Sequence, residues 1–267
     1  MAADLYHPWN EYVKPFKIID NLYFVGNVAS SSHLIDTGEG LVLIDTGYPQ
    51  TLYMLIESIW ELGFDVRDIK HIIHSHGHYD HLGATKALVE LCGAKTWLGT
   101  QDAPYADGRQ KLMTWASKLG YEYHETFEPD FLIKDGDVFN LGNVSIKMLN
   151  TPGHTPGTIS FFFDMPHQNK TLTVGMHGGV GTNSMEKSFL DEYGLDTSCW
   201  QNFFDGIKRL KKIHVDVFIG NHTWNNDTVG KSKRITADYN PFIDSAAWPR
   251  FLESRKLELE KVMAAEQ

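Results

Sequence analysis

The 267-residue chain is 42% hydrophobic and carries 34 acidic against 24 basic residues, which gives a formal net charge of −10. A chain of this size can bury a large core, and its mixed charges provide no basic stripe of the kind that binds nucleic acid or another polyphosphate. No apolar run approaches the roughly 20 residues that a membrane-spanning helix requires. Composition therefore predicts a soluble globular protein.

The N-terminal residues Met1 to His7 include neither the cationic start nor the apolar run of a secretion signal. We therefore expect a cytoplasmic protein, or a periplasmic or secreted one if a leader has been removed. Cys92 and Cys199 lie far apart and lack CxxC spacing, so we expect two buried thiols and no disulfide.

The first third of the chain is predicted to be mostly sheet. Apolar segments bounded by turn residues predict strands over 16–25, interrupted by an Asp-Asn turn, and over 32–36, 41–44 and 72–73. Apolar residues at helical spacing predict helices over 52–62 and 82–89. Asp45 directly follows a predicted strand. It either orients a metal-bound histidine or caps the following turn.

The remainder alternates strand and helix. Strands are predicted over 94–98, 131–133, 138–139, 144–149, 158–163, 171–174 and 215–219, and helices over 101–119, 200–212 and 241–263. The aromatic and acidic segment 121–130 shows neither period and predicts a long loop, either near a site mouth or as an ordinary surface connection. No linker interrupts the pattern, so we expect a single domain over residues 1–267.

The most informative stretch is HSHGHYDH, residues 74–81. It lies between a predicted strand and a predicted helix, and Gly77 allows a tight bend there. Four side chains that can ligate a metal can thus point into one cavity: His76, His78, Asp80 and His81. The spacing predicts a metal-binding loop.

Two later loops each present one histidine. His154 lies in TPGHTPG, where two prolines and two glycines restrict the backbone, and His222 follows the predicted strand 215–219. The glycine-rich segment that begins at His177 lacks the patterns of a phosphate loop and of a dinucleotide fold, so we predict a flexible wall of the site. Trp224 either walls the pocket or packs in the core.

Together these three loops resemble the metallo-β-lactamase fold superfamily, in its order and over nearly the whole chain. The resemblance implies an α/β (α+β) fold, an αβ/βα four-layer sandwich of two mixed β-sheets with outer helices. It also implies two Zn²⁺ per chain, although the ligand types suit iron or manganese as well. It places His76, His78 and His154 on the first metal and Asp80, His81 and His222 on the second.

Within that superfamily the chain is most similar to the subclass B3 metallo-β-lactamases. No cysteine follows the predicted strand 171–174, and the segment 240–244 also resembles that subclass. Many lactonases and glyoxalase II-type thioesterases place a metal-bridging Asp after this strand, where this chain has Gly175, Met176 and His177. The departure leaves open whether His177 contacts a metal.

The resemblance implies a dinuclear zinc hydrolase, a B3-like metallo-β-lactamase that opens a β-lactam-type cyclic amide by a metal-bound hydroxide. Asp80 would be the catalytic residue, both ligating the second metal and orienting the nucleophile. Candidate substrate contacts are Thr182, Asn183, Ser184 and Trp224.

The alternative is an intracellular lactonase or thioesterase of the same fold, which the missing signal favours and the missing bridging Asp disfavours. A nuclease would be expected to carry an inserted domain and a basic groove, and a degenerate binding scaffold is difficult to reconcile with all six ligands. We therefore expect a small-molecule substrate with a hydrolysable amide or ester, and neither nucleic acid nor membrane as a partner. The sequence leaves the oligomeric state open.

Overall fold

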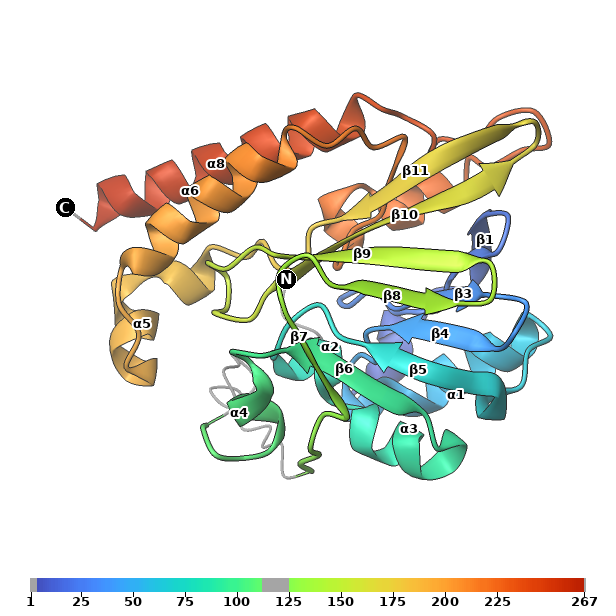
Figure 1. Cartoon of the computed structure of the whole chain (residues 1–267), viewed down its shortest axis with the longest axis horizontal. Coiled ribbons are helices and arrows are strands. Elements are labelled where there is room, and N and C mark those ends of the chain that lie inside the picture. Colours follow the sequence, from blue (N-terminus) through green and yellow to red (C-terminus); the bar gives the residue numbers. More distant parts are fainter. Residues whose placement is uncertain (1–3, 112–124, 267) are drawn as a thin grey trace.

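The computed structural model describes residues 4–111 and 125–266. Two β-sheets lie face to face, and helices cover the outer face of each (Figure 1). This arrangement confirms the predicted four-layer sandwich.

The first sheet has seven strands in sequence order. Its strands are β1 (Phe16–Ile19), β2 (Leu22–Phe24), β3 (His33–Asp36), β4 (Leu41–Ile44), β5 (Ile69–Ile73), β6 (Lys95–Gly99) and β7 (Phe131–Ile133). The first four are antiparallel, and β4 to β7 run parallel. Helices α1 (Leu52–Glu61) and α3 (Thr85–Cys92) pack apolar side chains such as Leu55 and Leu88 on its outer face.

The second sheet has the order β12-β11-β10-β9-β8. Its strands are β8 (Val138–Leu141), β9 (Val144–Asn150), β10 (Ile159–His167), β11 (Lys170–Met176) and β12 (Val217–Phe218). Helices α6 (Ser198–Leu210) and α8 (Ala247–Ala265) lie side by side above it (Figure 1). Phe203 and Trp248 from these helices pack on Phe162 and Phe218 of the sheet.

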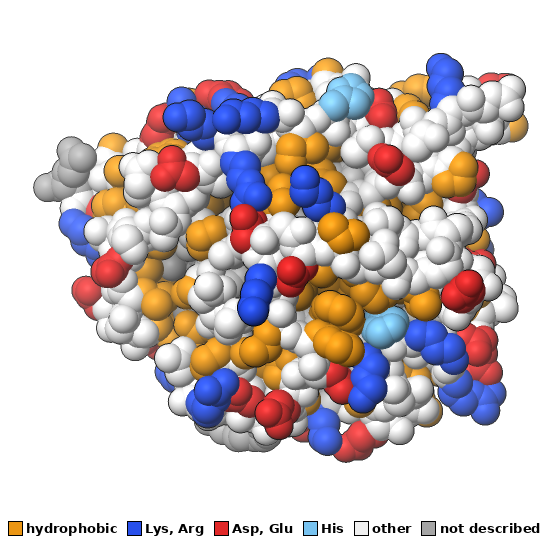
Figure 2. Space-filling view, in the orientation of Figure 1, with side chains coloured by type: hydrophobic (Ala, Val, Ile, Leu, Met, Phe, Trp, Pro, Cys, Tyr) orange, Lys and Arg blue, Asp and Glu red, His pale blue; other side chains and the backbone are white. Residues whose placement is uncertain are grey.

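The core between the sheets combines one face of each. Ile44 and Ile73 contribute from the first sheet, and Met148 and Phe161 from the second. Burying such apolar area is the main driving force that holds two sheets together. On the face shown in Figure 2, acidic and basic side chains are interspersed and form no field of one sign.

Short helices complete the connections. They are η1 (Pro8–Glu11), η2 (Pro49–Thr51), η3 (Val66–Asp68), α2 (Tyr79–Leu82), α4 (Ala103–Ala106), η5 (Asn183–Met185), α5 (Lys187–Tyr193), η6 (Thr223–Asn225) and α7 (Thr228–Ser232). In the part of the chain that the structure describes, no helix is long and apolar enough to cross a membrane. Both cysteines are free thiols and partly buried.

Two predicted helices differ from the structure, and one observed helix was not predicted. The helix predicted over 101–119 is represented by the four-residue α4, and residues 112–124 lie outside the described residues, as does part of the predicted loop 121–130. The last helix begins at Ala247 rather than at 241, because Ile243 still pairs with Val217 beside the second sheet. Helix α5 was not predicted.

The strand ends bring the candidate residues together. Parallel strands β4 and β5 end at the same edge of the first sheet, where ligand sites of such sheets usually lie. At this edge the backbone N–H of Ile159 in β10 donates to the carbonyl of Ser75 at 2.8 Å. The loop after β5 therefore lies directly beside the β9–β10 loop.

Candidate metal centre

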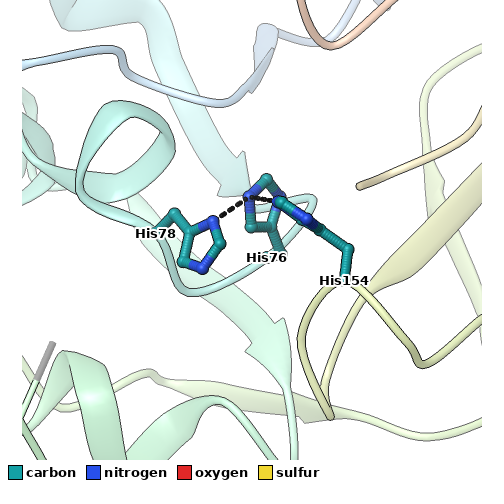
Figure 3. A group of neighbouring side chains, drawn as sticks. All are labelled: His76, His78 and His154. Carbon is teal, nitrogen blue, oxygen red and sulfur yellow. Dashed lines mark hydrogen bonds between the residues drawn. The ribbon is translucent and has the colours of Figure 1, made fainter. Parts of the chain in front are cut away.

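The first group of possible ligands consists of three buried histidines. His76 and His78 lie in the turn after β5, and His154 lies in the loop between β9 and β10 (Figure 3). The Nε2 atom of His76 lies 3.1 Å from Nδ1 of His78 and 3.2 Å from Nε2 of His154. The rings thus direct one nitrogen each toward a common point. We call these residues the first cluster.

Hydrogen bonds at the opposite ring nitrogens define which nitrogens carry lone pairs. His154 Nδ1 lies 2.7 Å from the Gly181 carbonyl and must donate to it. His76 Nδ1 lies 3.0 Å from the Ser75 hydroxyl, which donates its own hydrogen to Asp45 and so accepts from the ring. Both Nε2 atoms therefore present lone pairs to each other, an arrangement that a cation between them would stabilise.

His78 differs from the other two rings. Its Nδ1 faces Nε2 of His76, whereas its own Nε2 is buried without a hydrogen-bond partner among the described residues. A buried, unpartnered ring nitrogen costs free energy. Coordination of a metal by Nδ1 would offset that cost.

The second group consists of Asp80, His81 and His222. Asp80 and His81 lie on α2, and His222 follows β12. Oδ2 of Asp80 lies 3.4 Å from Nε2 of His81 and 3.8 Å from Nε2 of His222. The Asp80 side chain is 20% exposed, whereas that of His81 is fully buried. We call these residues the second cluster.

The two clusters are neighbours. The ring centroids of His76 and His81 lie 4.1 Å apart. A backbone carbonyl orients the His222 ring: its Nδ1 donates to the Ala29 carbonyl at 2.6 Å, which leaves Nε2 to face Asp80. Two adjacent ligand groups are the arrangement of a dinuclear site.

Asp45 contacts the second cluster directly. Its Oδ2 lies 2.8 Å from Nδ1 of His81, and its carboxylate also accepts from the Ser75 N–H at 2.7 Å and the Ser75 hydroxyl at 2.6 Å. The Asp45 backbone has a φ of +60°, a conformation that these bonds hold in place. The sequence left two roles open for Asp45, a cap of the following turn or a contact with a metal-binding histidine. The structure shows the contact, with the candidate ligand His81.

The clusters differ in charge. Burial lowers the pKa of His154 to about 4 and holds the pKa values of His76 and His78 well below the ordinary value. Burial also opposes a charge on His81, but the carboxylates of Asp80 and Asp45 outweigh it and raise the His81 pKa to about 10. At neutral pH and without metal, the first cluster is neutral and His81 is a cation.

The donor set fits a metal. Neutral imidazoles and one carboxylate are ligands that Zn²⁺ prefers, and three protein ligands at each metal leave a position for water or substrate. The six predicted ligands are thus brought together in two groups. This chemistry fits a dinuclear site without specifying the identity of the metals.

The predicted substrate-side residues have different surroundings. The Ser184 hydroxyl lies 2.9 Å from Nδ1 of His154 and donates to the His154 carbonyl, also at 2.9 Å. Thr182 lies 3.4 Å from Glu258, and Asn183 is exposed. Trp224 is 50% exposed and stacks on the His222 ring with centroids 4.1 Å apart. Asn183 and Trp224 are therefore the more accessible of the four side chains.

The glycine-rich loop after β11 packs on a ligand. A Cβ at Gly179 would lie 2.5 Å from Cδ2 of His154, so only glycine fits there without displacing the ring. His177 is buried in the same loop, accepts from the Gly179 N–H at 3.3 Å and belongs to neither cluster of the described chain. The predicted wall of the site is thus in direct contact with His154.

Sequence reasoning did not single out Asp102, which lies between the two loops that carry the first cluster. Its carboxylate accepts hydrogen bonds from the backbone N–H groups of Gly77 and Gly157, both at 2.7 Å, and from the Thr155 hydroxyl at 2.6 Å. Burial raises the pKa of this carboxyl to about 6 against these bonds. The available signal was weak: an acidic residue shortly after a predicted strand.

Comparisons with known proteins agree with this geometry. The model of the metallo-β-lactamase superfamily matches residues 25–166. BJP-1, a subclass B3 metallo-β-lactamase of Bradyrhizobium japonicum, superimposes with a TM-score of 0.88 at 26% identity and covers 98% of this chain and 97% of its own.

Two further proteins are similar over much of the chain. LRA-12, a class B3 di-zinc metallo-β-lactamase from an Alaskan soil metagenome, has a TM-score of 0.80 at 27% identity over 95% of each chain. The hydroxyacylglutathione hydrolase GloC of Haemophilus influenzae is 26% identical over 196 residues, 72% of this chain and 82% of its own. The chain is thus a hydrolase that belongs to the metallo-β-lactamase superfamily and is similar to its subclass B3 enzymes.

Proposed function

We propose that this protein is a dinuclear zinc hydrolase that opens a β-lactam-type cyclic amide. The observation that carries the proposal is the pair of adjacent clusters, His76, His78 and His154 beside Asp80, His81 and His222. Similarity to BJP-1 and LRA-12, which extends over nearly the whole of both chains, supports the β-lactam substrate class.

The three histidines of the first cluster would hold one Zn²⁺, and the second cluster would hold the other. When bound, the two ions would supply Lewis-acid polarisation of the substrate carbonyl and lower the pKa of a water molecule toward neutrality. The chain's own contribution is to fix the ligands. Asp45 orients His81, while the carbonyls of Gly181 and Ala29 orient His154 and His222.

Asp80 is the proposed catalytic residue. Its Oδ2 faces His81 and His222, which leaves Oδ1 to accept a hydrogen bond from the attacking water and to orient it. Partial exposure of this side chain gives solvent a path to it, in contrast to the fully buried His81.

The substrate would lie against Trp224, whose exposed ring offers an apolar surface stacked on a ligand. Asn183 and Thr182 would supply polar contacts to it. Ser184 would contribute after exchanging a hydrogen bond that it now makes with His154.

A thioesterase or lactonase is the second candidate, and similarity to GloC favours it. A hydroxyacylglutathione is a thioester, which the same metal chemistry would cleave. The absence of an Asp at the end of β11 opposes this candidate, because the strand ends with Gly175 and Met176 and the next residue, His177, lies outside both clusters.

The test is hydrolysis of a chromogenic cephalosporin by protein of known zinc content, compared with an acylglutathione thioester and a lactone at equal concentration. We expect the cephalosporin to be the best of the three substrates and a chelator to abolish its turnover. Cleavage of the thioester or lactone without lactam turnover would replace this function by the second candidate. Failure to bind zinc would contradict both.

A further inference from the structure

Asp102 connects the two loops of the first cluster without belonging to it. It follows β6, its side chain is fully buried, and each of its oxygens accepts a hydrogen bond from a loop residue. Oδ2 accepts from Gly77 and from the Thr155 hydroxyl, and Oδ1 accepts from Gly157. One carboxylate therefore binds both loops at once.

The bonded residues are neighbours of every ligand in the first cluster. Gly77 lies between His76 and His78, and Thr155 directly follows His154. The described contacts of Asp102 include no residue of the second cluster. Its influence is thus confined to the spacing of the three histidines.

Gly77 makes this close approach possible. A Cβ there would lie 3.0 Å from Cβ of Asp102 and 3.2 Å from its Oδ2, closer than side chains normally pack. Gly77 is not among the residues with positive φ. The chain bends at Gly77, as the sequence predicted, and the missing side chain also leaves space for Asp102.

We propose that Asp102 is a positioning residue that holds the His76–His78 turn and the His154 loop at the distance that one metal ion requires. The two loops are separated by more than 70 residues of chain, and the bond from Ile159 to Ser75 joins them only at the strand ends, so without Asp102 the metal would have to order the ligand-bearing residues at a cost in conformational entropy. The inference rests on the dinuclear site of the proposed function and is independent of the substrate.

The test is zinc binding by Asp102→Asn, measured by titrating metal-free protein against a chromophoric chelator. The substitution keeps the shape but replaces one acceptor oxygen by an NH₂ group that faces a donor. Supporting groups of this kind typically contribute 10- to 100-fold to metal affinity, so we expect roughly that loss for one zinc equivalent and none for the other.

Asp130→Asn is the matched control. Asp130 likewise accepts from a backbone N–H and a hydroxyl, both of Thr96, and from Lys95, but it reaches neither ligand loop. We expect the Asp130→Asn variant to bind both zinc equivalents with the affinities of the wild type. A similar loss in this control would show that general destabilisation, and not the bridge, weakens zinc binding.

Thr155→Val provides a milder change if Asp102→Asn fails to fold. It removes one of the three donors and should weaken the same zinc equivalent by a smaller factor. Wild-type affinity for both equivalents in the folded variants, or equal weakening of both, would overturn this inference alone. Wild-type protein that binds no zinc would overturn the proposed function and the inference with it.

Discussion

The two clusters lie side by side but differ in burial, charge and support. The first consists of neutral, buried imidazoles held by Gly181, by Ser75 and indirectly by Asp102. The second contains a carboxylate, is partly open to solvent, and holds His81 as a cation between Asp80 and Asp45 in the absence of metal. We propose that the first cluster mainly fixes its metal, whereas the second cluster, besides holding the other metal, handles protons and substrate.

The largest effect is expected from loss of a ligand in the first cluster. His154→Ala removes one of three imidazoles and the hydrogen bond that its Nδ1 donates to the Gly181 carbonyl. We expect turnover to fall by more than about 100-fold, because loss of a supporting group alone costs up to that much. Initial rates on the best substrate of the panel check this, and retention of a tenth of the activity would contradict the role of the first cluster.

Asp80→Asn tests whether the second cluster takes part in catalysis as well as in metal binding. The amide can still ligate through its oxygen but holds the attacking water less well, so turnover should fall by more than zinc content. Turnover rates and metal analysis of the same preparation give the two losses. Equal losses would show that Asp80 is a ligand only.

Asp45→Asn tests the support of the second cluster. The amide places a donor or a weaker acceptor opposite His81 and Ser75, and we expect roughly 10- to 100-fold weaker binding of one zinc equivalent. Because Asp45 also orients the Ser75 hydroxyl beside His76, some weakening at the first cluster is expected too, but the larger loss should fall on the equivalent that Asp102→Asn leaves unchanged. If both variants weaken the same equivalent most strongly, the clusters are not supported separately.

The pH dependence of stability tests the environment of Asp102, the residue that supports the first cluster. The Asp102 pKa of about 6 exceeds its ordinary value of 3.8, so the folded protein binds this proton more tightly than the unfolded chain does. The contribution of this proton to the free energy of unfolding is therefore complete below pH 4 and is lost as the pH rises through 6. The free energy of unfolding falls over this range by at most about 1.4 kcal/mol per pH unit.

Urea unfolding of the metal-free wild type and Asp102→Asn measures this contribution. The unfolding free energy of the wild type minus that of the variant should fall between pH 4 and 7 and then stay level, because the variant lacks the titrating group. A difference that is independent of pH, or that rises, would contradict the direction of the pKa shift.

The smallest effect is expected at the open side of the second cluster. Trp224→Ala removes the ring stacked on His222, and aromatic pairs contribute about 0.5–1.5 kcal/mol beyond their buried area. We expect KM to rise up to about 10-fold with zinc content unchanged. Steady-state kinetics with metal analysis checks this, and loss of zinc would show that Trp224 supports His222 instead.

The sequence was sufficient for the fold and the candidate ligands because their signals are local. HSHGHYDH places four donors within eight residues, and the resemblance that the three loops carry implies the sandwich, which the alternating strand and helix patterns fit. The helix predicted over 101–119 is wrong over residues 107–111, because an apolar pattern without capping signals does not specify a boundary, and from residue 112 the prediction lies outside the described residues. Helix α5 is stabilised by tertiary contacts of Phe189, which no local pattern shows.

The supporting residues could not be predicted because their partners are distant in sequence. Asp102 meets Gly77 and Gly157 only after β6 and the β9–β10 loop are placed beside the turn following β5. Asp45 shows the same limit, since its position after a strand allowed both a cap and a contact with His81. The bend at Gly77 was predicted correctly, whereas its second role, leaving space for Asp102, appears only in three dimensions.

The most direct test of two distinct metal sites is the zinc stoichiometry of the wild type, His154→Ala and His222→Ala, each refolded from the metal-free state. We expect two equivalents per chain in the wild type and one in each variant, with no zinc retained by the double variant at moderate chelator concentration. One equivalent in the wild type, abolished by either substitution alone, would mean that the six ligands form a single mononuclear site and would contradict the account.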